Sequence, residues 1–308
     1  MATLPETAPI PSREPADIRM LRGLLHRWPF PRGKGALVRA LSPLWKKREF
    51  LLAVEPGVFV PAELDDYMVR WVFVNGYHRD AVVKLSRELI RPGDTVIDIG
   101  ANIGLWSMGA ARAVGSTGSI HAIEPIAENY ARLLSNLELN GFSNVRATQL
   151  ACSNESGSVT MYRPSYDNSG HPTLGRRDGV DTPVSVTAVT LDDYCDRNAL
   201  ARVDFIKIDV EGAERLVFSG AARTLSSTEA PAILFEVNEE TARKLGSTTA
   251  DAKRILAAAG YEIFELVGRQ LVSVELDRLE EPGDLFAFKP HHYVRFPRLI
   301  QMGCRDKA

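Results

Sequence analysis

A chain of 308 residues with 45% hydrophobic and 25% charged residues has the composition of an ordinary globular protein, which excludes disorder as its default state. The formal net charge of -2 gives no overall attraction to nucleic acids or anionic membranes, so any such binding must be local. Its cysteines, Cys152, Cys195 and Cys304, are too few and too widely spaced for a disulfide framework or a paired metal motif. Because neither a signal peptide nor an apolar run of membrane-spanning length is recognisable, we expect a cytoplasmic protein.

Residues 1–66 are predicted to form a tail and a basic helical extension. Four prolines among the first 15 residues hinder regular hydrogen bonding, and the segment from Arg13 to Arg48 carries ten Lys or Arg residues against two acidic ones. Leucines and tryptophans are interleaved with these cations, so we expect helices that pack one apolar side on the main domain. The alternative is that this region contacts a membrane surface, a glycolipid or a polyanion.

Residues 67–308 are predicted to form one α/β domain. Short apolar runs alternate with helix-like stretches after Pro92, a pattern typical of a parallel sheet with crossover helices. Seven strands are expected, with the sequences TVIDIG, SIHAIEP, VRATQLAC, DFIKIDV, AILFEV, YEIFELV and DLFAFKP. The loop between the last two leaves no room for a crossover helix, so the last strand is expected to be antiparallel. We therefore predict a Rossmann-like, mostly parallel seven-stranded sheet with helices on both faces.

The segment TVIDIGANIGLWS predicts a ligand-binding turn between the first strand and its helix. The strand ends near Asp98, and Gly100, Asn102 and Gly104 follow, where glycines allow close approach of backbone and ligand. A dinucleotide-binding turn would read Gly-x-Gly-x-x-Gly, and counted from Gly100 the second and third glycines are missing. Asp98 at the mouth of the turn would repel a pyrophosphate but attract the ammonium or sulfonium of S-adenosylmethionine (SAM). A cofactor that carries a cation is therefore favoured.

The end of the second strand supplies a candidate for the ribose of such a cofactor. Glu124 lies 24 residues beyond Gly100, where a carboxylate can accept hydrogen bonds from both hydroxyls of a ribose. Ser153, directly after the third strand, is the last of the cofactor-binding candidates. The alternative is that the glycines only serve a tight turn and that Glu124 is a solvated strand end.

The segment RVDFIKIDVEGAE predicts the catalytic residues. Lys207 and Asp209 share one face of a strand, and a buried lysine needs a carboxylate partner, for which Asp209 and Glu236 are the candidates. Glu236 ends the next strand at the same edge, and Glu211 follows Asp209, so three carboxylates converge beside the cofactor. We assign Asp209 as general base or metal ligand, Glu236 as its partner and Lys207 as an electrostatic brace. Glu211 either contacts the substrate or caps the following helix.

A loop between the β-like segments VTMYR and VSVTAVT provides a second candidate base. It is rich in Gly, Pro, Ser and Asn, as expected of a lid, and it contains His171. Histidine titrates near neutral pH, so His171 could accept a proton, although a solvated or structural role is the alternative. Arg176 and Arg177 in this loop could meet an acidic acceptor.

Taken together, VIDIGANIG, IHAIEP, VTAVTLDDY and IKIDVEGAE followed by FEVN resemble the FkbM-type SAM-dependent methyltransferases, over roughly residues 75–290. This resemblance implies a class I methyltransferase domain whose sheet ends in a reversed hairpin. It also implies methylation by SAM, usually on an oxygen of a glycan, glycolipid or secondary metabolite, with a cofactor role for the glycine turn and Glu124. Family membership does not fix the substrate, and the first 60 or so residues lie outside the resemblance.

Two other classes of function stay open. A methyltransferase that acts on a nucleic acid or protein is the first; the basic N-terminal segment favours nucleic acid, whereas IDVEG stands where base methyltransferases carry an Asn/Asp-Pro-Pro motif. A module that binds SAM without catalysis is the second. A divalent metal is a possible second cofactor, with Asp209 and Glu236 as its ligands.

Overall fold

The computed structural model describes residues 12–27, 34–41, 50–62, 64, 66–77, 80–164 and 181–304. His171, Arg176 and Arg177 lie outside the described residues. The chain forms two compact units, residues 1–79 and 80–308.

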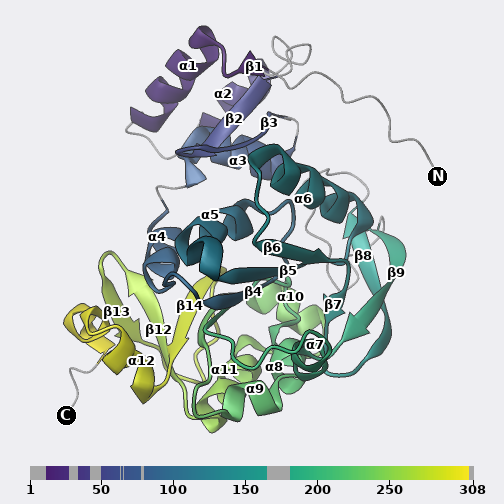
Figure 1. The fold of residues 1–308 in the computed structure, drawn as a ribbon, viewed down its shortest axis with the longest axis vertical. Helices are drawn as coiled ribbons and strands as arrows, with labels where there is room; N and C mark the ends of the chain where they lie inside the picture. Colours follow the sequence, from purple (N-terminus) through teal and green to yellow (C-terminus); the bar gives the residue numbers. More distant parts are fainter. Residues whose placement is uncertain are drawn as a thin grey trace. The chain divides into compact units, whose positions relative to one another are not determined.

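The first unit combines helices with a small sheet (Figure 1). Its elements are β1 (Ser12–Arg13), α1 (Ala16–Arg27), α2 (Lys34–Leu41), β2 (Phe50–Glu55), β3 (Val58–Pro61) and α3 (Tyr67–Asn75). β2 pairs with β1 in parallel and with β3 antiparallel, so the predicted helical extension also contains strands. α1 is amphipathic, with Ile18 and Leu25 buried and Met20 and Leu24 exposed. Contact of this region with a membrane or glycolipid stays a prediction.

The second unit is built on an eight-stranded sheet in the order β13-β12-β14-β11-β10-β4-β5-β6. Its strands are β4 (Thr95–Ile99), β5 (Ser119–Ile123), β6 (Val145–Thr148), β10 (Phe205–Ile208), β11 (Ala232–Val237), β12 (Glu262–Val267), β13 (Gln270–Ser273) and β14 (Gly283–Phe288). The strands from β11 to β6 in this order are parallel, and β14 is antiparallel to both β11 and β12. The predicted mostly parallel α/β sheet with a reversed last strand is therefore confirmed.

Helices cover both faces of this sheet (Figure 1). α4 (Ala81–Glu88), α5 (Leu105–Val114) and α6 (Ala127–Asn140) lie on one side, and α8 (Glu214–Ser219), α9 (Ala222–Ser226) and α11 (Thr249–Ala258) on the other. The other α-helices in the described part of the second unit are α7 (Leu191–Arg197), α10 (Glu239–Lys244) and α12 (Pro290–Arg295). A buried hydrophobic cluster joins α8 and α11 to alternate residues of the strands, such as Ile97, Ile206 and Ile233. The intervening residues face α5, where Trp106 stacks on Phe205.

Two details differ from the predicted strands. The run VRATQLAC is divided, because only β6 joins the main sheet, whereas β7 (Ala151–Cys152) pairs with β9 (Asp181–Val189) in a second sheet of order β7-β9-β8. The third strand of that sheet is β8 (Gly157–Pro164). In addition, β13 pairs with β12 as an eighth strand of the main sheet, in a segment that the sequence analysis treated as a loop.

Ion pairs hold the amino-terminal edge of the main sheet. Arg295 of α12 contacts Asp94, just before β4, and Asp204, just before β10, each at 2.5 Å. Asp204 also accepts a hydrogen bond from the backbone N–H of Thr95 at 3.0 Å. These contacts tie α12 to the start of two central strands.

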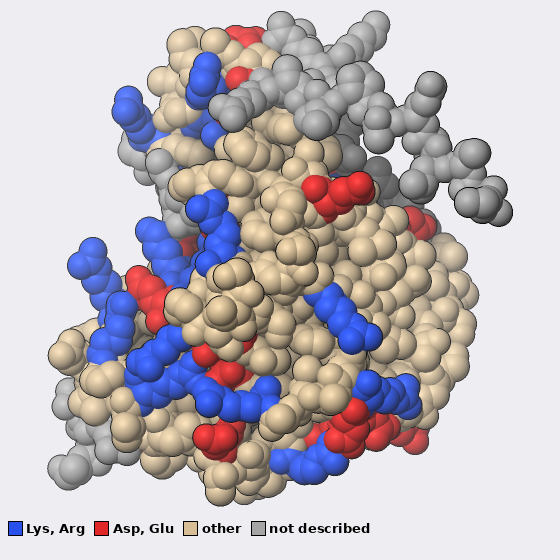
Figure 2. Space-filling model, viewed as in Figure 1, with Lys and Arg blue, Asp and Glu red and all other residues tan. Residues whose placement is uncertain are grey.

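The distribution of surface charge agrees with the small net charge of -2. Figure 2 shows basic and acidic side chains intermixed on the face that it draws. Among the described residues, no helix combines the length and the apolar character that crossing a bilayer requires.

Candidate active site

Polar side chains meet at the carboxyl-terminal edge of the main sheet. The parallel strands β4, β5, β10 and β11 end at this edge, and β14 begins there because it runs the other way. Ligands of open α/β sheets bind at such an edge. The acidic and basic residues that the strands deliver to it are Asp98, Glu124, Lys207, Asp209, Glu236 and Asp284.

The glycine turn after β4 is shaped by its protein neighbours. Gly100, Asn102 and Gly104 all have left-handed backbones, with φ of 81°, 51° and 87°. A Cβ on Gly100 would lie 1.8 Å from the carbonyl oxygen of Asp209, and one on Gly104 would lie 2.4 Å from Cδ1 of Leu133. Protein atoms thus fill the space that a side chain at either glycine would need, in place of the predicted ligand. The turn therefore packs directly on the end of β10.

The turn leads into the N-terminus of α5. Gly104 is the N-cap of α5 and, as a glycine, has no side chain that could cap the helix. The N-terminus of this ten-residue helix presents backbone N–H donors and a partial positive charge to an anionic group. The carboxylate of an amino-acid cofactor is one such group.

Glu124 is buried at the end of β5, with 4% of its surface exposed, so it is no solvated strand end. Its carboxylate accepts hydrogen bonds from the backbone N–H groups of Asn102 (2.8 Å) and Ile126 (3.0 Å) and from the side chain of Asn129 (3.4 Å). Burial raises the pKa of Glu124 to about 7, although these hydrogen bonds work against it. A carboxylate has about four acceptor positions, so Glu124 keeps capacity for one further strong donor.

Asp98 lies deeper than the sequence indicated. Its side chain is fully buried and accepts hydrogen bonds from Oγ of Ser107 at 2.6 Å and from Nζ of Lys207 at 3.3 Å. The expected position at the mouth of the turn is therefore wrong, because α5 and β10 close over this carboxylate. Any effect of Asp98 on a cofactor must act through its charge or through these partners.

Lys207 links the glycine turn to the predicted catalytic residues. Its ammonium group lies 3.1 Å from the carboxylate of Asp209 and 3.3 Å from that of Asp98. The predicted contact with Asp209 is present, whereas Asp98 was not foreseen as a partner. β10 lies beside β4 in the sheet, in a register that places Lys207 opposite Asp98, and this explains the second contact.

Asp209, Glu211 and Glu236 form an acidic cluster. One carboxylate oxygen from each lies within 4.8 Å of the others, as the sequence analysis expected of three converging carboxylates. The Asp209 side chain is 43% exposed and thus open to a ligand. Glu211 has a left-handed backbone with φ of 53°, which directs the chain sharply from β10 into the next turn. The N-cap residue of α8 is Ala213, two residues after Glu211, so Glu211 is not itself the N-cap, and contact of its carboxylate with the helix N-terminus stays a prediction.

Glu236 has a strongly raised pKa within the acidic cluster. Its Oε2 atom is buried and has no hydrogen-bond partner among the residues that the structure describes. Burial, together with the charges of Asp209 and Glu211, raises the pKa of Glu236 to about 11. This raised pKa favours the protonated carboxyl group at neutral pH, which can donate a hydrogen bond.

Two acidic residues near the cluster were missed. Asp284 at the start of β14 is paired directly with Glu236, and the predicted antiparallel return of DLFAFKP was the signal that could have found it. Asp284 is exposed, yet the protein around its carboxyl group and the charge of Asp209 raise its pKa to about 7. Glu214, the last residue of the IDVEGAE motif, is buried and accepts a hydrogen bond from the N–H of Gly212 at 3.1 Å. Glu214 thus holds the turn that carries Glu211.

The other candidates are not brought to this edge by the described contacts. Ser153 is buried after β7, in the second sheet, where its Oγ donates to Asn154 at 3.1 Å and its N–H to the carbonyl of Val189 at 3.0 Å. It does not end a strand of the main sheet, because VRATQLAC divides before it. His171 lies outside the described residues, so its role as a base stays a prediction.

Residues 98–263, more than half of the chain, match the family model described as the methyltransferase FkbM domain. The chain belongs to this family. This FkbM-family protein is 32% identical over 160 residues to the 31-O-demethyl-FK506 methyltransferase FkbM of Streptomyces tacrolimicus, a match that covers 42% of this chain and 60% of the relative. It is 27% identical over 164 residues to the 2-O-methyltransferase NoeI of Sinorhizobium fredii, covering 47% of this chain and 66% of the relative. The matches therefore span less than two thirds of either relative.

Solved structures provide a weaker likeness. The crystal structure of the methyltransferase FkbM from Methylobacillus flagellatus is 16% identical with a TM-score of 0.41, and the match covers 82% of this chain and 60% of the other.

Proposed function

We propose that the protein is a SAM-dependent O-methyltransferase that acts on a hydroxyl group of a sugar, glycolipid or secondary metabolite. The observation that carries this proposal is the acidic cluster of Asp209, Glu211 and Glu236, which lies next to the glycine turn of a methyltransferase family. The names of two relatives, which mention a 31-O-demethyl substrate and a 2-O-methyltransferase, support an oxygen as the acceptor atom.

The residues around the glycine turn fit SAM. The N-terminus of α5 offers backbone donors to the cofactor carboxylate, and Glu124 has acceptor capacity for a ribose hydroxyl. Asp98 contributes negative charge from behind the turn, in favour of a cationic cofactor. When bound, SAM would supply a methyl group made electrophilic by the sulfonium. Positioning of the acceptor against that methyl group is then the main task of the protein.

Asp209 is proposed as the general base. Its side chain is 43% exposed and contacts Lys207, whose ammonium group favours the ionised carboxylate that can accept a proton. The acceptor hydroxyl would transfer its proton to Asp209 as its oxygen attacks, because a neutral alcohol is a weak nucleophile. Protonated Glu236 would donate a hydrogen bond that orients the acceptor.

A divalent metal is the alternative way to activate the hydroxyl. Three carboxylate oxygens within 4.8 Å form a donor set that hard cations such as Mg²⁺ accept. A metal held by Asp209, Glu211 and Glu236 would polarise the acceptor oxygen in place of a base. Binding would require Glu236 to lose its proton, so metal addition should release protons if this alternative is right.

The proposal is tested first by calorimetric titration with SAM, with NAD as the control, with and without Mg²⁺. Transfer of a labelled methyl group to a panel of sugars and hydroxylated metabolites then tests the activity. Asp209→Asn should abolish transfer and keep SAM binding, whereas Asp196→Asn, at a 62% exposed residue of α7, should leave both unchanged. Binding of NAD but not SAM would overturn the cofactor assignment. Full transfer by Asp209→Asn would move the base to another residue, with His171 next.

A further inference from the structure

Asp284 occupies the same face and edge of the sheet as the acidic cluster. In the register, Lys207 is paired with Leu234, Leu234 with Phe286, and Glu236 with Asp284. Paired residues of neighbouring strands project from the same face, and so do residues two apart along one strand. Asp284 therefore shares its face with Lys207 and Glu236, although it follows Glu236 by almost fifty residues in the chain.

The spacing of the strands separates Asp284 from the proposed base. β10 and β14 lie on either side of β11, so the backbones at Asp209 and Asp284 are about two strand spacings, or roughly 10 Å, apart. Both residues are open to solvent, in contrast to the fully buried Asp98. An acceptor that gives its reacting hydroxyl to Asp209 must carry a second polar group at some distance in order to reach Asp284.

The charge around Asp284 selects the kind of polar group. The groups that act on its carboxylate are Asp209 and Lys207 from β10 and the segment after it, and Asp80 before α4, while β11 contributes Glu236. Lys207 already holds two carboxylates, at 3.1 and 3.3 Å. An anionic group on the acceptor would be repelled here, whereas a hydroxyl group can donate a hydrogen bond to Asp284.

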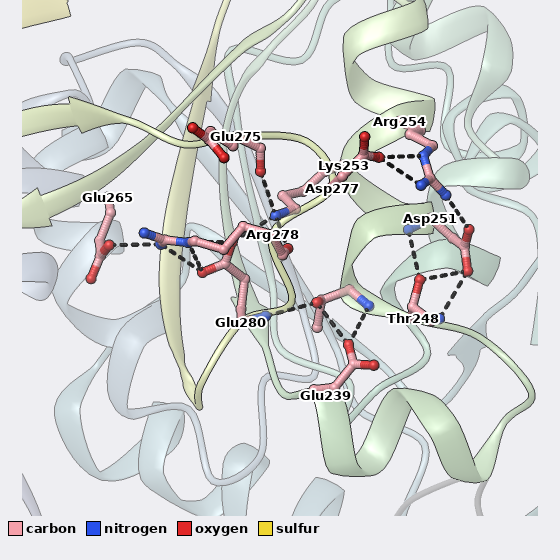
Figure 3. A network of polar contacts seen from close by, with 11 residues as sticks. Glu239, Thr248, Asp251, Lys253, Arg254, Glu265, Glu275, Asp277, Arg278 and Glu280 are labelled. Atoms are coloured by element: carbon pink, nitrogen blue, oxygen red, sulfur yellow. Dashed lines mark hydrogen bonds and ion pairs between the residues drawn. The ribbon is translucent and has the colours of Figure 1, made fainter.

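The chain leading into β14 is anchored at Glu280, and Asp284 itself is held in the sheet by its pairing with Glu236. Figure 3 shows Lys253 of α11 bonded to Glu280, four residues before Asp284, and Glu280 bonded in turn to Arg278. Lys253 is fully buried, and its ammonium group also donates to the carbonyl oxygens of Glu275 and Arg278. A specificity residue on a rigid element positions a ligand more accurately than one on a loop.

We propose that Asp284 is an acceptor-specificity residue, which binds a second hydroxyl of a neutral, polyhydroxylated acceptor and disfavours acceptors with an anionic group at that place. This inference rests on the proposed methyltransferase function. It separates the roles of the two exposed carboxylates, because Asp209 handles the proton of the reacting hydroxyl and Asp284 holds the acceptor in place. Arg176 and Arg177 were predicted to meet an acidic acceptor, which is the opposite preference to the one proposed for Asp284.

The test compares neutral and anionic acceptors of the same ring. Methyl glucoside, methyl galactoside and methyl rhamnoside are offered with labelled SAM, alongside methyl glucuronoside and methyl galacturonoside. The neutral glycosides should be methylated with at least a tenfold higher kcat/KM than the uronosides. For a neutral glycoside, Asp284→Asn should raise KM at least tenfold and change kcat less than threefold. The ratio of kcat/KM between neutral glycosides and uronosides should become smaller in this variant. Asp284→Glu should recover part of the affinity.

Controls separate this inference from the proposed function. Asp277→Asn changes an 82% exposed aspartate in the segment before β14 and should leave KM unchanged. Affinity for SAM in each variant reports whether the second unit has kept its fold. Methylation of glycosides with an unchanged KM in Asp284→Asn, or a preference for the uronosides, overturns the role of Asp284 and leaves the proposed function standing. No methylation of any glycoside by a wild-type protein that binds SAM overturns both the sugar acceptor and this inference.

Discussion

The buried ammonium group of Lys253 is expected to stabilise the second unit strongly. Its side chain is fully buried and binds Glu280, itself 6% exposed, at 2.6 Å, as well as two backbone carbonyl oxygens (Figure 3). Lys253→Met keeps most of the volume of the side chain and removes all three hydrogen bonds. Breaking a buried ion pair from one side costs about 3–5 kcal/mol, because the other charge is left without compensation. Arg278 still contacts Glu280 at 2.6 Å, so we expect the lower end, about 3 kcal/mol.

The next residue of the same helix provides a matched control. Arg254 pairs with Asp251 at 3.0 Å and with Asp277 at 2.6 Å, but its side chain is 53% exposed (Figure 3). Exposed pairs contribute about 0–1 kcal/mol, so Arg254→Met should hardly change the stability. In thermal unfolding followed by circular dichroism, a loss of about 3 kcal/mol lowers Tm by roughly 6–12 °C for a unit of this size. A fall of less than 2 °C in Lys253→Met, or equal falls in the two variants, would refute the reasoning.

The pH dependence gives a second readout of the same pair. Burial works to raise the pKa of Glu280, but the hydrogen bonds from Arg278 and Lys253 outweigh it and hold the pKa below its ordinary value of 4.5. A carboxylate with a lowered pKa contributes stability that is fully present above pH 4.5 and lost as the pH falls through the folded-state pKa. The difference in Tm between the wild type and Lys253→Met should therefore narrow in acid.

Three further predictions concern the site. Glu124→Gln removes the charge that accepts three donors and should weaken SAM binding at least tenfold in calorimetry; unchanged affinity would exclude Glu124 from the cofactor site. Gly100→Ala would place a Cβ 1.8 Å from the Asp209 carbonyl oxygen, and because a shift of about 1 Å can cost 100-fold in rate, kcat should fall by that order. Glu236→Gln should stabilise the metal-free protein by up to about 3 kcal/mol at pH 7 and much less at pH 4.5, since a raised folded-state pKa lowers stability as the pH rises above 4.5. Chemical denaturation at the two pH values measures this difference, and a variant less stable at pH 7 would contradict the raised pKa.

The sequence predicted most strands of the main sheet because each is a short apolar run with clear ends. It failed where the partner of a segment decided the structure. Ala151 and Cys152 look like the end of a strand that begins at Val145, yet they pair with Ala188 and Val189 in another sheet. β13 was missed because only Leu271 of its four residues is buried, so its sequence shows no apolar run.

The same limit explains what was predicted in the site. Alternation along a strand was sufficient to place Lys207 and Asp209 on one face, and their contact follows. The contact of Lys207 with Asp98 depends on β10 lying beside β4, and strand order is set by tertiary packing rather than by either segment alone. Asp284 needed both the direction of β14 and its position beside β11, of which only the direction could be predicted.

The glycine turn and the acidic cluster are connected twice. The backbone of Gly100 packs against the carbonyl of Asp209, and the ammonium of Lys207 joins Asp98 to the carboxylate of Asp209. A change that leaves the backbone contact intact, such as Asp209→Asn, should therefore affect the acceptor alone, because Lys207 retains an oxygen to bind. Lys207→Met instead leaves the buried Asp98 without its ammonium partner, and it should weaken SAM binding and turnover together. Loss of turnover with unchanged SAM affinity in Lys207→Met would show that the side-chain connection serves only the acidic cluster.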